Sequence, residues 1–204
     1  TYTVRPYLAT PIDERYIIAS EGGDTSVKPG QGEVHGITRI PEEYHISAHE
    51  SGLVLEALER LKDSTFSISC SFHHPHPPFV ALEKYMNMFP PEDMIIPASI
   101  DDNMLNSPYL GVKQGTESRY SDPEKVKYWI SEYYALVKEI DDRIGAILNK
   151  LDDLGLTDNT LVIFMSDHGE MLGSHGMKSK NVFYEEASHI PLMMRFPGKI
   201  EAGT

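Results

Sequence analysis

Apolar side chains recur at helical spacing in two parts of this chain. In the first part they lie on one face of a predicted helix: Leu53, Val54, Leu58 and Leu61. This spacing predicts a helix from about Ala48 to Lys62. Ser47 and Glu50 have the S-x-x-E spacing of a capping box, in which each side chain satisfies a free amide at the helix start.

The second helical pattern is longer and more regular. Its apolar residues hold a spacing of three or four positions throughout: Val126, Ile130, Tyr133, Val137, Ile140, Ile144, Ile147, Leu151 and Leu154. Ser121 and Glu124 form another capping-box pair, and Pro123 suits the first helical turn. Gly155 suits a C-cap, so the pattern predicts one long helix between Ser121 and Gly155.

Strand patterns follow both predicted helices. In Ser64–Phe72, apolar residues alternate with serines and a threonine, which is typical of a strand with one buried face. Thr160–Ser166 is a short apolar run centred on β-branched residues, which predicts a buried strand. Pro191–Phe196 predicts another buried strand, and Arg15–Ser20 a short one.

The alternation of helices and strands predicts an α/β fold with a mostly parallel sheet flanked by helices. We expect Ser64–Phe72 and Thr160–Ser166 to be parallel in one sheet, with their carboxyl ends on the same edge. Residues 1–46 form a loop-rich lead-in that includes a predicted loop at Glu21–Gly36, and residues 47–204 carry the helix–strand units. Phe79–Tyr120 has no sustained period and predicts a long loop over the site. A short helix is expected at Asn181–Ser188.

Composition excludes two classes of partner. The net charge is −13, from 31 acidic residues against 18 lysines and arginines, so the chain should repel nucleic acid and anionic membranes. No apolar run approaches the roughly 20 residues that span a bilayer. Cys70 is the only cysteine, so no disulfide can form within the chain, and its place in a predicted strand indicates an inert buried thiol.

Chemistry gathers where the two main predicted strands end. Asp167 and His168 follow Thr160–Ser166, and H-H-P-H-P-P follows Ser64–Phe72, with histidines at positions 73, 74 and 76. Taken singly, each group is weak evidence: an aspartate can cap a helix, and histidines and lysines are usually exposed. Together, a hard oxygen ligand, an imidazole such as His76 and a lysine such as Lys180 would suit hydrolysis of a charged ester.

The stretch S-D-H-G-E-M-L-G-S-H-G-M-K-S-K-N-V-F-Y-E-E, followed by I-P-L-M-M-R-F-P-G, resembles the sulfatases of the alkaline phosphatase superfamily. The upstream S-F-H-H-P-H-P-P-F resembles the Pro-His-x-Pro site of the same family. This resemblance covers roughly Ser64 to the end. It implies that Asp167 and His168 are metal ligands, although many members carry Asn at the second position.

The same resemblance assigns roles to four further residues. His76 would assist at the leaving-group oxygen, and Lys180, directly before N-V-F-Y-E-E, would contact the sulfate in preference to Lys178. His74 and His175 would contact the substrate. The implied cofactor is a divalent metal, Ca²⁺ or Mg²⁺, with Mn²⁺ as a further alternative. The implied substrate is a small-molecule or glycan sulfate ester, and the family favours a periplasmic or secreted location.

The chain departs from the family pattern at the nucleophile. Sulfatases use a cysteine or serine in C-x-P-x-R or S-x-P-x-R, oxidised to formylglycine, and neither motif occurs here. The early pair of metal-binding aspartates and the C-terminal subdomain are also missing. We therefore expect an incomplete, internal portion of a sulfatase catalytic domain, inactive by itself, whose partners include the remaining parts of a parent chain.

Two other functions remain open at this stage. A phosphodiesterase or phosphonate monoester hydrolase of the same superfamily would use similar motifs on phosphorus. A non-catalytic domain that binds anionic ligands is the alternative of a different class. The nucleophile motif of the parent chain would separate the two enzymes, because C/S-x-P-x-R favours a sulfatase and a bare Thr or Ser favours phosphoryl chemistry.

Overall fold

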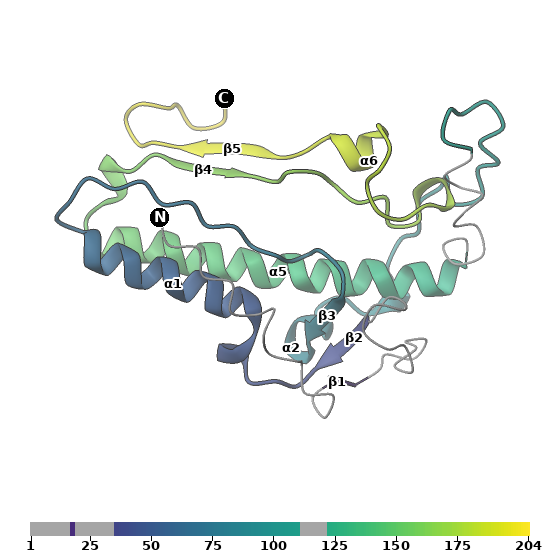
Figure 1. The fold of residues 1–204 in the computed structure, drawn as a ribbon, viewed down its shortest axis with the longest axis horizontal. Helices are drawn as coiled ribbons and strands as arrows, with labels where there is room; N and C mark the ends of the chain where they lie inside the picture. Colours follow the sequence, from purple (N-terminus) through teal and green to yellow (C-terminus); the bar gives the residue numbers. More distant parts are fainter. Residues whose placement is uncertain (1–16, 19–34, 111–121) are drawn as a thin grey trace. The chain divides into compact units, whose positions relative to one another are not determined.

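The computed structural model describes residues 17–18, 35–110 and 122–204 (Figure 1). The chain forms two compact units. The first contains residues 1–90 and 131–150, and the second contains residues 91–130 and 151–204. Within the described ranges, no helix combines the length and apolar character needed to cross a membrane.

A three-stranded sheet lies in the first unit. Its strands are β1 (Ile17–Ile18), β2 (His35–Thr38) and β3 (Phe79–Leu82), in the order β1-β2-β3. The β1–β2 pair is antiparallel and the β2–β3 pair is parallel, with His35 opposite Phe79. All four residues of β3 are buried, and α2 (Glu83–Met86) follows β3 directly.

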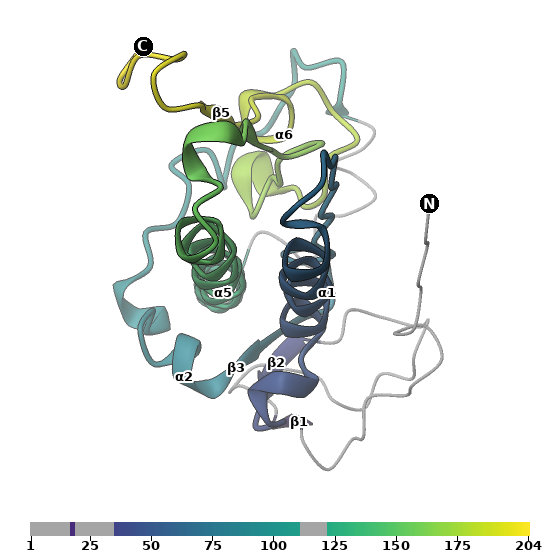
Figure 2. The same cartoon turned by 90° about the vertical axis from the view of Figure 1, so that its left-hand side faces the viewer.

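Two amphipathic helices contribute to the first unit, one of them only through its middle, residues 131–150. The α1 helix (Ile46–Leu61) follows the short 3-10 turn η3 (Glu42–Tyr44) and runs beside α5 (Pro123–Asp153), as Figures 1 and 2 show. Buried apolar residues of α1 and of the middle of α5 include Val54, Leu58, Ala135, Leu136 and Ile140. Both predicted helices are therefore confirmed, because the apolar stripe that predicted each one supplies core residues.

The two ends of α5 have identifiable caps. At its start, Asp122 Oδ1 accepts a hydrogen bond from the Glu124 amide at 3.1 Å, while Ser121, the predicted cap, lies outside the described residues. At its end, Gly155 has a φ of +67°, and its amide donates to Asp152 O at 3.0 Å. Leu156 N–H donates to Leu151 O at 2.9 Å, which completes a Schellman motif. The predicted C-cap at Gly155 is confirmed.

A two-stranded antiparallel sheet lies in the second unit. Strands β4 (Val162–Met165) and β5 (Leu192–Arg195) pair so that Val162 is opposite Arg195. The short helix α6 (Glu185–Ser188) precedes β5, and 3-10 turns lie at η4 (Pro91–Asp93), η5 (Thr157–Asn159) and η6 (Ser174–Gly176). The predicted strands at Thr160–Ser166 and Pro191–Phe196 are confirmed. Their predicted burial is wrong, because Ile163 and Met165 are 50% and 58% exposed and all of β5 is exposed.

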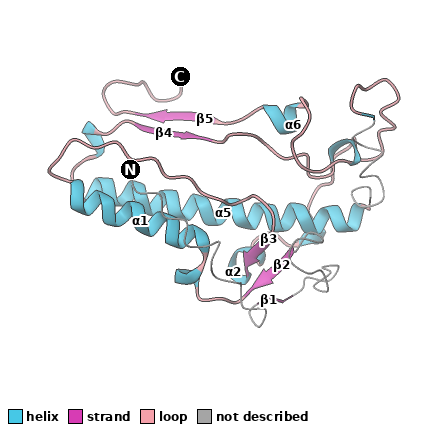
Figure 3. Ribbon diagram, in the orientation of Figure 1, coloured by secondary structure: helices cyan, strands magenta, loops and turns pink. Residues whose placement is uncertain are grey.

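The predicted pairing of strands is also wrong. Ser64–Phe72 forms no strand and belongs to the long loop that joins α1 to β3 in Figure 3. Its apolar side chains are nevertheless less exposed than the serines between them. The alternation in sequence therefore matches an alternation in burial, although the backbone pairs with no strand. The strand that follows α1 is β3, inside the segment Phe79–Tyr120 for which a loop was predicted, and β4 pairs antiparallel with β5. Helices and strands do alternate, as the α/β prediction requires.

Candidate functional site

Asp167 and His168 lie directly after β4. The His168 amide donates to Asp167 Oδ1 at 3.0 Å, and His168 Nδ1 donates to Gly169 O at 2.8 Å. Because a carbonyl oxygen only accepts, Nδ1 carries the ring hydrogen of the neutral imidazole and Nε2 carries a lone pair. Nε2 lies 3.7 Å from Asp167 Oδ2. The two side chains thus present two electron-pair donors to one small volume.

This arrangement fits a divalent metal ion. Two adjacent ligands of an ion bound at about 2.0–2.5 Å are roughly 3–3.5 Å apart, close to the observed separation. Metal-bound histidines usually donate their other ring N–H to a carbonyl or carboxylate, as His168 donates to Gly169 O. The Asp167 side chain is 88% exposed, which leaves it accessible to an ion and to ligands from other residues.

The loop after His168 is held closely. Gly169 N–H donates to Ala187 O at 2.8 Å, and a Cβ at this glycine would lie 2.0 Å from Glu186 O. Gly173 has a φ of +92°, and a Cβ there would lie 2.7 Å from Val126 Cγ1 at the start of α5. Both positions therefore require glycine, which is the physical reason for two of the glycines in the D-H-G-E-M-L-G stretch.

The two lysines of the loop differ in their surroundings. Lys178 Nζ lies 5.3 Å from the centroid of the Trp129 ring, in a cation–π contact. Lys180 is partly buried, and no hydrogen bond or ion pair joins it to another described residue. This difference agrees with the assignment of the sulfate contact to Lys180, which stays a prediction.

His175 is tied into the second unit. Its Nδ1 donates to Asp102 Oδ2 at 2.7 Å, and its ring stacks on Tyr184 with centroids 4.2 Å apart. Its backbone amide donates to Ser99 Oγ at 3.2 Å, and its φ of +54° is left-handed. These contacts fix the ring in place. The predicted contact of His175 with a substrate stays a prediction.

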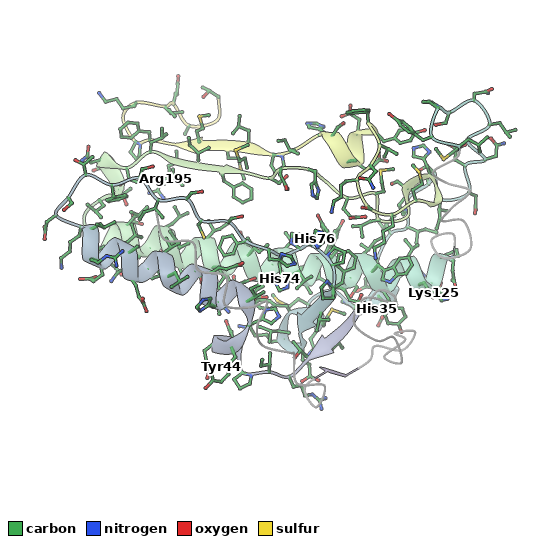
Figure 4. All side chains as sticks on the ribbon, in the orientation of Figure 1. His35, Tyr44, His74, His76, Lys125 and Arg195 are labelled. Carbon is green, nitrogen blue, oxygen red and sulfur yellow. The ribbon has the colours of Figure 1, made fainter. Side chains whose placement is uncertain are left out.

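The two remaining histidines of the predicted site, His74 and His76, lie on the segment before β3 and are labelled in Figure 4. His76 is exposed, and its Nδ1 donates to Pro77 O at 2.7 Å, so Nε2 is the nitrogen open to exchange protons with a ligand. The segment is anchored to α1 through Glu50, whose carboxylate oxygens accept from the His73 amide at 3.2 and 3.3 Å. Burial raises the pKa of Glu50 to about 7, against the lowering effect of that amide.

His74 is the buried histidine of this segment, with 8% of its surface exposed. Ser47 Oγ lies 2.9 Å from its Nδ1, and burial lowers the pKa of His74 to about 3, so the ring is neutral at physiological pH. The capping box expected from Ser47 and Glu50 is therefore wrong: the N-cap of α1 is His45, no side chain caps the helix, and both residues bind the histidine segment. The predicted contact of His74 with a substrate stays a prediction.

Sequence reasoning overlooked a buried polar cluster beside His74. His45 Nδ1 lies 2.8 and 2.9 Å from the two carboxylate oxygens of Glu139, and Glu139 is fully buried. Glu132 is also fully buried, and His35 Nδ1 lies 3.0 Å from its Oε1. The signal was present in the sequence: Glu132 and Glu139 are seven positions apart, so they share a face of the helix.

The structure thus brings Asp167 and His168 together and places Lys180 and His175 in the same unit. His74 and His76 belong to the other unit. The convergence of His76, Asp167, His168 and Lys180 on one pocket stays a prediction. Cys70 is half-buried outside any strand, and burial, with a smaller effect of Glu50, raises the pKa of its thiol to about 11.

Comparison with known proteins places these motifs in a family. The family model described as Sulfatase matches residues 45–204. A multifunctional alkaline phosphatase superfamily protein, PehA of Trinickia caryophylli, is 30% identical over 88% of this chain and 40% of its own length. An endo-4-O-sulfatase of Bacteroides thetaiotaomicron is 32% identical over 87% of this chain and 34% of its own length.

A solved structure supports the same placement. The phosphonate monoester hydrolase of Silicibacter pomeroyi superposes with a TM-score of 0.74 at 25% identity, over 95% of this chain and 40% of its own. The α/β, alkaline-phosphatase-like fold predicted from the sequence is thereby confirmed. The chain spans less than half the length of each of these three proteins.

Proposed function

Since this chain belongs to the sulfatase family, we propose that the protein hydrolyses a sulfate ester of a sugar or an aryl alcohol with the help of a divalent metal ion. The observation that carries the proposal is the pair formed by Asp167 Oδ2 and His168 Nε2, 3.7 Å apart within the matched residues. This pair lies in the motif by which the chain resembles the family, and its geometry suits a metal ion.

Asp167 and His168 would hold the metal, together with ligands from outside this pair. When bound, the ion would supply positive charge next to the sulfate oxygens, where negative charge accumulates during hydrolysis. The ligand types favour an ion that accepts both oxygen and nitrogen, because carboxylates suit Mg²⁺, Ca²⁺ and Mn²⁺ whereas imidazoles suit transition metals. We therefore favour Mn²⁺ over Ca²⁺ and Mg²⁺ for this chain.

Lys180 and His76 have complementary roles in the proposal. The Lys180 ammonium would pair with a sulfate oxygen, and no described residue competes for it through a hydrogen bond or ion pair. Protonated His76 would donate the Nε2 proton to the leaving alcohol oxygen as the S–O bond breaks, so that a neutral alcohol leaves. The Pro77 carbonyl keeps Nδ1 as a donor, which directs that proton transfer to Nε2.

The nucleophile in this proposal is the formylglycine that the family resemblance implies. No C/S-x-P-x-R motif occurs in the 204 residues, so none of them is assigned as the nucleophile. His175 would keep the loop that carries Lys180 in place through Asp102 and Tyr184. The substrate would be a small-molecule or glycan sulfate ester. We also propose a periplasmic or secreted location, which the family resemblance favours.

A second candidate function is hydrolysis of a phosphonate monoester or phosphodiester. One comparison favours it: the superposition on a solved phosphonate monoester hydrolase. The imidazole of His168, where many sulfatases carry an amide, also distinguishes this chain. Sulfate remains our first proposal, because the matching family model is the sulfatase model.

The test is a substrate panel with one common leaving group. The full-length protein, purified with Mn²⁺, would be assayed with 4-nitrophenyl sulfate, the 4-nitrophenyl ester of phenylphosphonate, and bis(4-nitrophenyl) phosphate. We expect the highest kcat/KM on the sulfate and its loss in an Asp167→Ala variant. A higher kcat/KM on the phosphonate would replace the first proposal with the second, and no activity on any of the three would reject both.

A further inference from the structure

Three buried side chains from three parts of the first unit meet beside the histidine segment. His45 is the N-cap of α1, Glu139 is in the middle of α5, and His74 precedes β3. His45 and His74 are each 8% exposed and Glu139 is fully buried. One ligand atom from each residue lies within 4.8 Å of the others.

The hydrogen bonds around the cluster leave suitable nitrogens facing inward. His45 Nδ1 lies 2.9 Å from Glu139 Oε1 and Nε2 lies 3.3 Å from Val80 O, so with an ion bound at Nδ1 the Nε2–H would donate to Val80 O. His74 Nδ1 can donate to Ser47 Oγ at 2.9 Å, which leaves Nε2 with a lone pair. Both histidines therefore have the outer hydrogen-bond partner that metal-bound imidazoles usually have.

The buried carboxylate of Glu139 faces His45 with both oxygens. Oε2 lies 2.8 Å from His45 Nδ1 without hydrogen-bond geometry, and Oε1 lies 2.9 Å from the same nitrogen and 3.5 Å from Arg143 Nη2. Arg143 is shared, because its Nη2 also donates to Glu42 at 2.7 Å. A fully buried carboxylate beside two buried imidazoles presents the donor types of a metal site, and an ion would add a charge partner for the carboxylate.

We propose that His45, His74 and Glu139 bind a Zn²⁺ ion, with a water molecule as the fourth ligand. Two imidazoles and one carboxylate are a donor set that Zn²⁺ accepts, and its ligands lie roughly 3.4 Å apart in a tetrahedral site. To reach that geometry, the widest separation would shorten by about 1.4 Å, and the 2.9 Å between His45 Nδ1 and Glu139 Oε1 would lengthen by about 0.5 Å. This site is separate from the proposed metal ligands Asp167 and His168, and its residue His74 would hold the ion instead of contacting the substrate as the family resemblance implies.

The ion would join α1, α5 and the segment that carries His76. The His73 ring lies between the other two imidazoles of the segment: its centroid is 5.1 Å from that of His76 and 6.3 Å from that of His74. His76 therefore connects to the cluster through His73. Zinc bound here would fix the backbone from which His76 extends. His45, His74 and Glu139 would then be positioning residues for His76, independent of the ester that the protein cleaves.

The test measures zinc in a background that lacks Asp167, one of the two other proposed metal ligands. The full-length Asp167→Ala protein would be stripped with a chelator, dialysed against Zn²⁺ and analysed by mass spectrometry for bound zinc. We expect one zinc fewer in the Asp167→Ala, His74→Ala protein. An Asp167→Ala, His49→Ala control removes an exposed histidine of α1, the helix that His45 caps, and should keep its zinc. Equal zinc in the His74 and His49 variants would overturn the proposal.

A second variant keeps the test decisive if His74→Ala does not fold. Ser47→Ala removes only the outer partner of His74 and should weaken Zn²⁺ binding by about 10- to 100-fold. Co²⁺ would report the geometry, because tetrahedral Co²⁺ absorbs much more strongly in the visible range than octahedral Co²⁺. Two results would contradict the site: unchanged zinc affinity in the Ser47→Ala protein, or no strong Co²⁺ absorption in the protein that keeps Ser47.

Discussion

His168 Nε2 lies 3.7 Å from Asp167 Oδ2 while His168 Nδ1 donates to the carbonyl of Gly169. The hydrogen bond to Gly169 settles which ring nitrogen has a free lone pair, and the 3.7 Å distance shows that this lone pair and a carboxylate oxygen share one small volume. Neither fact depends on an ion being present. A nitrogen ligand at this position should therefore influence which metal the protein prefers.

Replacing His168 by Asn should change the metal preference. An amide oxygen is a hard ligand that suits Ca²⁺ and Mg²⁺, whereas imidazole suits transition metals. We expect His168→Asn to lower Mn²⁺ affinity by about 10-fold or more while affecting Ca²⁺ affinity much less, as measured by titration calorimetry. His189→Asn, at an exposed histidine after α6, is the control. Equal losses for both metals would show that His168 does not select the ion.

Gly173→Ala should destabilise the protein. The φ of +92° disfavours any side chain, and the new methyl group would lie 2.7 Å from Val126 Cγ1, so we expect a loss of about 1–3 kcal/mol in the free energy of unfolding. Gly145→Ala in α5 is the matched control, since nothing lies within 4 Å of its added Cβ. That change should be neutral or stabilise by up to about 1 kcal/mol. Urea denaturation of both variants measures the difference.

Cys70 should react slowly with alkylating reagents. Its pKa is raised to about 11 by burial and then by Glu50, so almost no thiolate exists at pH 8 and the rate should still rise with pH up to about 11. The control is Ser69→Cys in a Cys70→Ser background, which places a thiol at the exposed neighbouring position. Iodoacetamide should modify that thiol at least about 10-fold faster at pH 8. Equal rates would contradict the raised pKa.

The two lysines of the site loop should differ in their effect on catalysis. Lys180→Ala removes the proposed sulfate contact and should lower kcat/KM on the favoured ester by about 100-fold or more. Lys178→Ala removes a contact with Trp129, worth about 0.5–1 kcal/mol of stability, and should leave kcat/KM within a few-fold of the unchanged protein. A larger loss for Lys178 than for Lys180 would reverse the assignment.

Local sequence predicted the helices well because each one has a continuous apolar stripe. The stripe from Val126 to Leu154 and the cap at Gly155 define α5 without any information about its neighbours. Asp167 and His168 were found for a similar reason, since a polar pair directly after an apolar run is visible in sequence.

Strand pairing and the roles of several polar residues could not be predicted in this way. Ser64–Phe72 has the alternation of a strand, but pairing depends on a neighbouring backbone that the alternation does not specify. β3 has only four residues, which is too short for a period. Ser47 and Glu50 match a capping box, yet a buried imidazole and a loop amide compete for the same oxygen atoms. Such long-range partners leave no mark in a local pattern.

The central claim is that His76, Asp167, His168 and Lys180 act on one sulfate ester. The most direct measurement is an experimental structure of the full-length protein with Mn²⁺ and a non-hydrolysable sulfamate analogue of the ester. We expect the metal within about 2.5 Å of Asp167 Oδ2 and His168 Nε2, and His76 Nε2 within about 3 Å of the bridging atom of the analogue. A His76 ring more than about 15 Å from the Asp167 carboxylate would contradict the claim, because no proton can pass directly across that distance.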